Sequence, residues 1–274
     1  MDPDLEAFAA LARAPDLEID LARGALAIAR VEYPGLAAAP WLAELDRLAA
    51  RAGVAPAGDR VRALHRLREF LFEEEGFRGN AEDYYDPRNS CLNEVLARRL
   101  GIPITLAVVM MEVGRRVGLR LLGVGLPGHF LVRADVGDGP VLLDPFDGGA
   151  VVTPERADDL VARALGRRVR LRAEDFAPVT TRQILTRMLR NLELVYARRG
   201  AWSKLLGVYE RLLVLDGETP AYLRDRGTVL VRLGELHRGV ADWERYLAAC
   251  PEARDAEAVR QRLRQVRQRL ATLN

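Results

Sequence analysis

The stretch from Asn89 to Pro103 reads N-S-C-L-N-E-V-L-A-R-R-L-G-I-P, and it decides how the rest of the sequence is interpreted. Asn89 or Ser90 can cap a helix, because either side chain can accept hydrogen bonds from the free amides of a first turn. Apolar residues follow at helical spacing, and a glycine and a proline predict where this helix ends. Cys91 is therefore predicted to lie in the first turn of a capped helix.

A cysteine in this position can act as a nucleophile. The free amides and the dipole of a helix N-terminus favour a thiolate, and a thiolate also needs a base and a group that orients the base. His129 opens a strand-like run after Pro127 and Gly128, and Asp144 ends the next such run. The pattern predicts a Cys91–His129–Asp144 triad for thiol acyl transfer, with the Cys91 backbone amide donating to the oxyanion.

Two alternatives stay open on the residues alone. Free cysteine is often simply buried, so Cys91 can also be a packing residue. The hairpin register decides the other two residues: a four-residue loop from Asp135 to Asp138 sets His129 opposite Asp144. A two-residue turn at Asp138 and Gly139 instead sets Asp144 opposite Arg133, as an ordinary cross-strand ion pair.

The rest of the first part predicts an α+β domain with a small antiparallel sheet. Residues 1–75 show helical spacing of apolar residues, including Val61, Leu64, Leu67 and Leu71. Residues 106–117 predict a second, buried helix after the one that follows Cys91. Three short runs then predict strands, at residues 119–126, 129–135 and 141–144.

The C-terminal part predicts helical repeats. Gly200 and Gly234 both separate helical stretches and lie 34 residues apart, and so do Tyr209 and Trp243. A 34-residue helix–turn–helix period is the tetratricopeptide length. We therefore expect a domain at residues 1–175, a boundary near residues 173–181, and repeats at residues 176–274 that end in a helix over residues 255–273.

Composition excludes several functional classes. The 274 residues carry a formal net charge of +2, which does not indicate a nucleic-acid partner. Cys91 and Cys250 cannot form a disulfide framework, so a cytoplasmic location is expected. We expect no signal peptide, because the N-terminus is acidic, and no membrane-spanning helix, because no apolar run is long enough. No residues have zinc-ligand spacing. Residues 123–128 match the dinucleotide fingerprint, but a strand follows them, so no cofactor is predicted.

Three blocks of this sequence resemble one bacterial family. The first is residues 86–96 with 101–106, the second is residues 123–132, and the third is residues 143–146 with Gly148 and Gly149. Together they are similar to the transglutaminase-like and tetratricopeptide repeat proteins of the SirB type, and the helical tail also fits. The resemblance covers nearly the whole chain.

The resemblance implies a papain/transglutaminase-like fold for about residues 1–175. By position it implies that Cys91 is the nucleophile, His129 the base and Asp144 the orienting acid, with amide hydrolysis or transglutamination as the reaction. It also implies a rival function, because many family members carry a bulky apolar residue at the position of Cys91. In that case the fold is a catalytically silent module that binds a protein or peptide together with its repeats.

Overall fold

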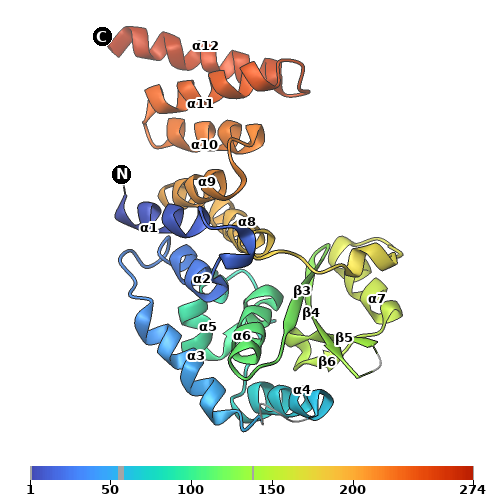
Figure 1. Cartoon of the computed structure of the whole chain (residues 1–274). Helices are drawn as coiled ribbons and strands as arrows, with labels where there is room; N and C mark the ends of the chain where they lie inside the picture. The colour runs from blue at the N-terminus through green and yellow to red at the C-terminus, as the bar shows by residue number, and fades with distance from the viewer. Residues whose placement is uncertain (1, 55–58, 138, 274) are drawn as a thin grey trace. The chain divides into compact units, whose positions relative to one another are not determined.

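The computed structural model describes residues 2–54, 59–137 and 139–273, and these divide into two compact units (Figure 1). One unit runs from Ala14 to Met188, and the other combines residues up to Arg13 with residues from Leu189 onward. This division differs from the predicted boundary at both ends. Helix α1 (Pro3–Ala12) packs against α9, and the boundary falls inside α8 because Leu185 packs on Gly24 of the first unit.

The first unit begins with helices, as the apolar spacing predicts. They are η1 (Asp16–Glu18), α2 (Leu21–Ala29), α3 (Ala39–Arg51), α4 (Arg60–Glu69) and the π-helical turn η2 (Phe70–Glu74). Leu64, Leu67 and Leu71 are buried, whereas Val61 in the first turn of α4 is 39% exposed. Gly76 follows with φ +73°, a conformation that glycine adopts at no steric cost, and it ends this helical stretch as expected.

Several short elements and one longer helix follow. They are β1 (Arg78–Gly79), η3 (Pro87–Ser90), α5 (Leu92–Arg98), β2 (Leu100–Gly101) and the longer helix α6 (Pro103–Arg116). Strands β1 and β2 pair in parallel, so the segment before η3 lies beside the segment after α5. Helix α6 is buried along most of its length, in agreement with the predicted buried helix.

The sheet has the order β3-β4-β5-β6 and is antiparallel throughout the described residues. Its strands are β3 (Leu121–Leu126), β4 (His129–Val136), β5 (Gly139–Asp144) and β6 (Ala150–Val151). Val132 pairs with Leu143 and Val136 with Gly139, so both predicted hairpin registers are wrong. Strand β4 ends at Val136, Gly137 follows with φ +60°, and β5 begins at Gly139, so neither predicted loop matches the observed pairing. Asp138, which both predicted loops include, lies outside the described residues.

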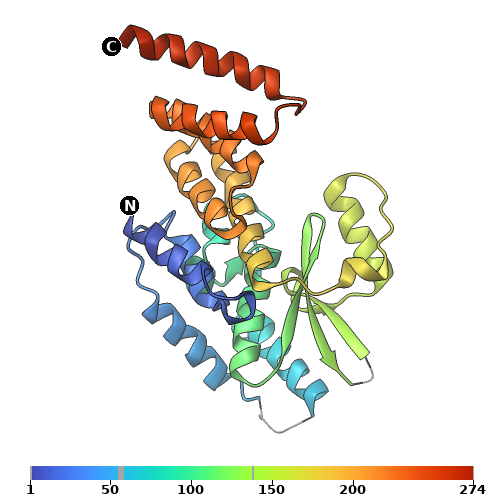
Figure 2. The ribbon, with the colours of Figure 1, turned by 45° about the horizontal axis from the view of Figure 1, so that its top comes forward.

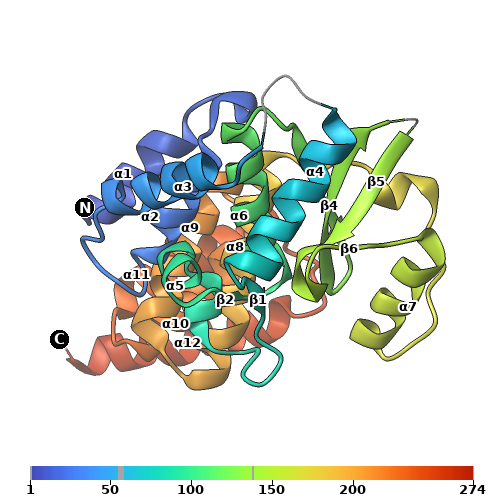
Figure 3. The same cartoon turned by 90° about the horizontal axis from the view of Figure 1, so that it is seen from below.

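The sheet lies between two helices, with α6 on one side and α7 (Pro154–Leu165) on the other (Figure 3). Val124, Leu131 and Val161 form part of the cluster between the sheet and α7. Phe130 and Val132, which point to the opposite face of β4, are at most 1% exposed as well. Strand β4 is therefore buried on both faces, and its first residue, His129, is held by a rigid element.

The second unit is built from paired helices (Figure 2). The first unit ends with η5 (Ala173–Phe176) and the first residues of α8 (Thr181–Arg199). The second unit contains the rest of α8, followed by α9 (Trp202–Asp216), α10 (Pro220–Arg232), α11 (Leu236–Ala249) and α12 (Ala256–Leu273). Gly200 and Gly234 have φ +63° and +85° at equivalent inter-helix turns, and Tyr209 and Trp243 are buried at equivalent positions. The predicted 34-residue repeat is confirmed.

Replacing Gly227 by alanine is expected to destabilise this unit. An added Cβ would lie 2.7 Å from the Trp243 ring and 3.0 Å from the Gly239 carbonyl oxygen, and the backbone oxygen cannot move aside alone. Overpacking of this kind costs about 1 to 3 kcal/mol, more than alanine gains from its helix propensity. Chemical denaturation followed by tryptophan fluorescence measures it. Ser203→Ala, on an exposed position of α9, is the control, and equal stability of Gly227→Ala and wild type would contradict the packing.

Candidate functional site

His129 and Asp144 form a hydrogen-bonded pair at one end of the sheet. His129 Nε2 lies 2.8 Å from Asp144 Oδ2, and the two side chains are 11% and 2% exposed. The other carboxylate oxygen accepts from the Phe146 backbone N–H at 2.9 Å, which fixes the carboxylate in the turn η4 (Pro145–Asp147). With Nε2 engaged, Nδ1 is the ring nitrogen that remains for a further partner.

The pair forms although both predicted registers are wrong. The last described pair at this end is Val132 with Leu143, so Asp144 is placed diagonally from His129 rather than opposite it. Diagonal neighbours are about 7 to 8 Å apart at Cα, which long side chains can span. Arg133, the alternative partner of Asp144, instead pairs with Asp135 at 2.8 Å.

Cys91 is placed differently from the prediction. It is the N-cap of α5 rather than a residue of its first turn, because Pro87–Ser90 form the separate short helix η3. The residue is 0% exposed, and its thiol lies 3.5 Å from the Pro87 carbonyl oxygen, to which it donates. Its backbone N–H donates to Arg88 O at 3.2 Å, so the amide expected to serve the oxyanion is already bonded.

The helix that follows Cys91 is also not the one that packs on the sheet. Helix α5 packs against α2, η3 and α6, whereas α6 packs against β3 and β4. Tyr33, which follows α2, lies close to Cys91: burial raises its pKa, and the neighbouring Glu94 and Cys91 raise it further. The structure therefore brings His129 and Asp144 together, and it places the Cys91 thiol in the packing of η3 and α5.

A loop between β1 and η3 covers the pair. The Phe146 ring stands edge-on to His129 with centroids 6.4 Å apart, and Tyr84 stands edge-on to Phe146 at 6.0 Å. Gly79 makes room for this arrangement, since an added Cβ would lie 2.5 Å from the Phe146 ring. An aromatic cluster therefore lies against the imidazole.

Asp86 and Asn89 anchor this loop. The Asp86 carboxylate accepts from the backbone N–H and Nε of Arg88 and forms an ion pair with Arg98 at 3.5 Å. Burial raises the pKa of Asp86, but the hydrogen bonds and charge of Arg88 outweigh burial and hold the pKa below its usual range. Asn89 donates to Asp83 O at 2.7 Å from a fully buried position.

Arg187 is a residue of this site that sequence reasoning missed. Its Nη2 donates to Leu126 O and to His129 O, both at 2.6 Å, and its guanidinium lies 5.5 Å from the Phe130 ring centroid. Burial lowers the pKa of Arg187, and Tyr84 lies within electrostatic range of it. In the sequence it is one charged residue of an amphipathic helix, and no spacing distinguishes it from its neighbours.

The glycines of residues 123–128 serve packing. Gly123 leaves space for the Phe130 ring and Gly125 for the Arg187 guanidinium, at 2.7 and 3.2 Å from the positions that their Cβ atoms would occupy. Gly128 has φ +72° in the β3–β4 turn and lies against Ala164 of α7. The segment forms a strand and a turn, so it does not open a helix as the dinucleotide fingerprint requires.

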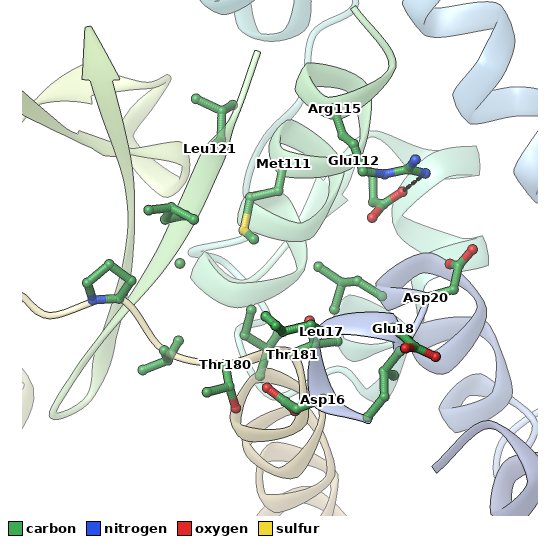
Figure 4. A pocket seen from close by; sticks show the side chains of 17 residues that line it. Asp16, Leu17, Glu18, Asp20, Met111, Glu112, Arg115, Leu121, Thr180 and Thr181 are labelled. Carbon is green, nitrogen blue, oxygen red and sulfur yellow. Dashed lines mark hydrogen bonds and ion pairs between the residues drawn. The ribbon is translucent and has the colours of Figure 1, made fainter. Parts of the chain in front are cut away.

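A separate cleft of about 550 Å³ lies between η1, α6 and β3 (Figure 4). Its walls carry Asp16, Glu18 and Met111, and its Glu112 is ion-paired with Arg115 at 3.0 Å. Cys91, His129 and Asp144 are not among its lining residues. In residues 2–54, 59–137 and 139–273, no group of three or more His, Cys, Asp or Glu side chains is placed to hold a metal ion. Among the described helices, none combines the length and apolar character needed to cross a membrane.

Asp144→Asn is expected to lower the free energy of unfolding by about 1.5 to 3 kcal/mol, the range for hydrogen bonds to charged groups. The amide keeps one acceptor for Phe146 but loses the charge that faces His129. Asp147→Asn is the matched control, because Asp147 is 58% exposed and paired with Arg156, and a surface pair contributes about 0 to 1 kcal/mol. Equal destabilisation by both variants in chemical denaturation would show that the buried pair contributes no more to the free energy of unfolding than the surface pair does.

Asp86→Asn is expected to expose Cys91. Losing the ionic hydrogen bonds of Asp86 weakens the anchor of η3, and a loss of about 1.5 to 3 kcal/mol raises the open population roughly 10- to 100-fold. The rate of Cys91 alkylation at constant pH, in a Cys250→Ser background, reports that population. Asp83→Asn, an exposed carboxylate of the same loop, should leave the rate unchanged. An unchanged rate in Asp86→Asn would rule out this anchor.

Comparison with known proteins agrees with this fold. The family model of the transglutaminase-like superfamily matches residues 39–190, and a tetratricopeptide repeat model matches residues 192–264. The chain is 40% identical over 255 residues to a UPF0162 protein of Xylella fastidiosa (strain 9a5c), covering 91% of each. It is 36% identical over 217 residues to a UPF0162 protein of Pseudomonas aeruginosa, covering 78% of each.

A more distant relative shares only part of the chain. F-box only protein 21 of Homo sapiens is 30% identical over 145 residues, which cover 50% of this chain and 22% of that protein. The family models, the UPF0162 relatives and the observed order of an α+β unit and paired helices agree with the SirB-type resemblance. The chain belongs to the transglutaminase-like superfamily and to the UPF0162 family, and tetratricopeptide repeats follow its transglutaminase-like domain.

Proposed function

We propose that this chain is a protein-interaction module in which the transglutaminase-like domain is catalytically silent. The observation that carries the proposal is the burial of Cys91, whose sulfur is 0% exposed and donates to the Pro87 carbonyl. A nucleophile must reach the carbonyl carbon of its substrate and the base that takes its proton. A fully buried thiol engaged with a backbone carbonyl does not meet the first of these requirements, because a substrate carbonyl cannot reach it.

Two further observations support the same conclusion. The Cys91 backbone N–H is bonded to Arg88 O, whereas an oxyanion hole needs a donor aimed at the substrate. Helix α6, which packs against the strand of His129, begins with Pro103, Ile104 and Thr105 and so presents no thiol in its first turn. On this proposal the pair of His129 and Asp144 locks the end of the hairpin.

Binding would then be the task of the whole chain. Tetratricopeptide-type helix pairs stack into surfaces that bind peptides and proteins, and fold alone does not require catalysis. The proposed partner is a protein or peptide. Neither a nucleic acid nor a membrane is proposed as a partner. A cytoplasmic location belongs to the proposal as well, because Cys91 and Cys250 do not form a disulfide with each other in the structure.

The proposal predicts that Cys91→Ala leaves partner binding nearly unchanged, and that neither wild type nor this variant catalyses acyl transfer. Glutamine-containing peptides, a labelled amine acceptor and amide substrates are incubated with wild type, Cys91→Ala and His129→Ala. Product formation, measured by mass spectrometry, is expected to be equal in all three and equal to the protein-free blank. In-cell cross-linking should give the same partners for wild type and Cys91→Ala. Turnover that disappears in both variants would overturn the proposal.

A second function is favoured by one observation, the 2.8 Å hydrogen bond between His129 and Asp144. In this alternative Cys91 attacks an amide or ester carbonyl, His129 delivers the proton to the leaving group, and Asp144 orients the imidazole. The acyl group then passes to water or to an amine. The alternative requires η3 to move the thiol away from Pro87, which the structure does not show.

A further inference from the structure

Arg187 is a partly buried cation that has no acidic partner in the described part of the chain. Its recorded hydrogen bonds go from Nη2 to the carbonyl oxygens of Leu126 and His129, on either side of the β3–β4 turn. Arg116 and Arg226 are similarly enclosed, but Glu112 and Asp242 neutralise them at short range. An enclosed charge is costly unless it is paired, so an anion bound next to Arg187 would offset the cost of burying its charge.

Two tyrosines of the covering loop form an exposed aromatic surface. Tyr84 is 37% exposed and Tyr85 44%, and their rings stand edge to face at 5.3 Å. The chain of contacts runs from Tyr84 to Phe146 and from Phe146 to His129, and Tyr84 and Arg187 lie within electrostatic range of each other. Half-exposed tyrosines together with an arginine are the composition typical of binding hot spots.

We infer that Tyr84, Tyr85 and Arg187 form the docking surface for a partner peptide that presents a carboxylate to Arg187. Both Nη2 hydrogens of Arg187 already serve backbone carbonyls, so Nη1 and Nε are the donors left for a carboxylate. The tyrosine rings offer apolar area at low entropic cost. This inference rests on the proposed interaction function and names its surface and partner class.

The charges nearby favour one carboxylate over a polyanion. Arg88, in the helix η3 that follows the covering loop, is already paired with Asp86 at 2.8 Å. One uncompensated guanidinium with the Tyr84 ring in its electrostatic range fits a single acidic side chain set in an apolar peptide. A nucleic-acid backbone or a multiply phosphorylated segment needs a cluster of free cations.

Two pools of immobilised peptides test the inference. Both pools have random uncharged residues and capped termini, and they differ only in a central Glu or Gln, so the carboxylate is the single variable. Wild-type full-length protein is expected to bind the Glu pool about tenfold or more tightly than the Gln pool, the effect of one charged hydrogen bond. Arg187→Gln should erase this preference, and Arg168→Gln, which removes an exposed arginine of the same unit, should preserve it.

Tyr84→Ser tests the contribution of the tyrosine rings separately from that of the Arg187 charge. It should weaken binding of both pools and leave the Glu-to-Gln ratio intact, because it does not touch the hydrogen bonds of Arg187. Arg187→Lys replaces Arg187→Gln if the latter unfolds by losing its two carbonyl contacts. It keeps the cation but loses the Nη1 and Nε donors, so it should bind with a reduced ratio.

The outcomes distinguish this inference from the proposed function. A wild-type ratio near one, or a ratio that survives Arg187→Gln, overturns the assignment of Arg187 and leaves the interaction function standing. Cys91-dependent cleavage of the bound peptides contradicts the proposed function instead, and a Glu preference lost in Arg187→Gln would then report substrate specificity.

Discussion

The buried side chain of Asn89 is the constraint on which the centre of the first unit depends. Its amide donates to the carbonyl oxygens of Asp83 and Tyr84 and accepts from Asn80, which fixes the loop beside β1. The backbone carbonyl of Asn89 accepts from the Thr105 hydroxyl at 2.7 Å, which ties η3 to the first turn of α6. A buried polar group is costly unless its partners are in place, so these bonds hold three segments in one arrangement.

This arrangement determines what the neighbouring residues can do. Because η3 is fixed at both ends, Cys91 is held as the N-cap of α5 with its thiol and amide turned to backbone carbonyls. The same loop brings Tyr84 onto Phe146 and so covers the pair of His129 and Asp144. The features that resemble an active site and the features that favour a binding surface are therefore two consequences of one anchored loop.

Much of the fold could be predicted from the sequence. Apolar spacing indicates which faces of helices and strands are buried, and the 34-residue repeat indicates where helices pair. The site could be predicted only in part. His129 and Asp144 meet through a diagonal contact that depends on a one-residue choice of turn, and local residues do not determine that choice. Arg99 ends α5 in a left-handed conformation where glycine is usual, because Glu44 and Glu75, far away in sequence, hold its side chain. Long-range contacts of this kind leave no local pattern.

The alkylation rate of Cys91 as a function of pH, in a Cys250→Ser background with and without His129→Ala, tests the central claim most directly. If Cys91 is a packing residue, its reaction is slow, needs the alkaline pH at which unpaired thiols ionise, and is unchanged by His129→Ala. A rate that persists well below that pH and is lost in His129→Ala would show a thiolate paired with the imidazole. That result would contradict the silent module and establish the thiol chemistry.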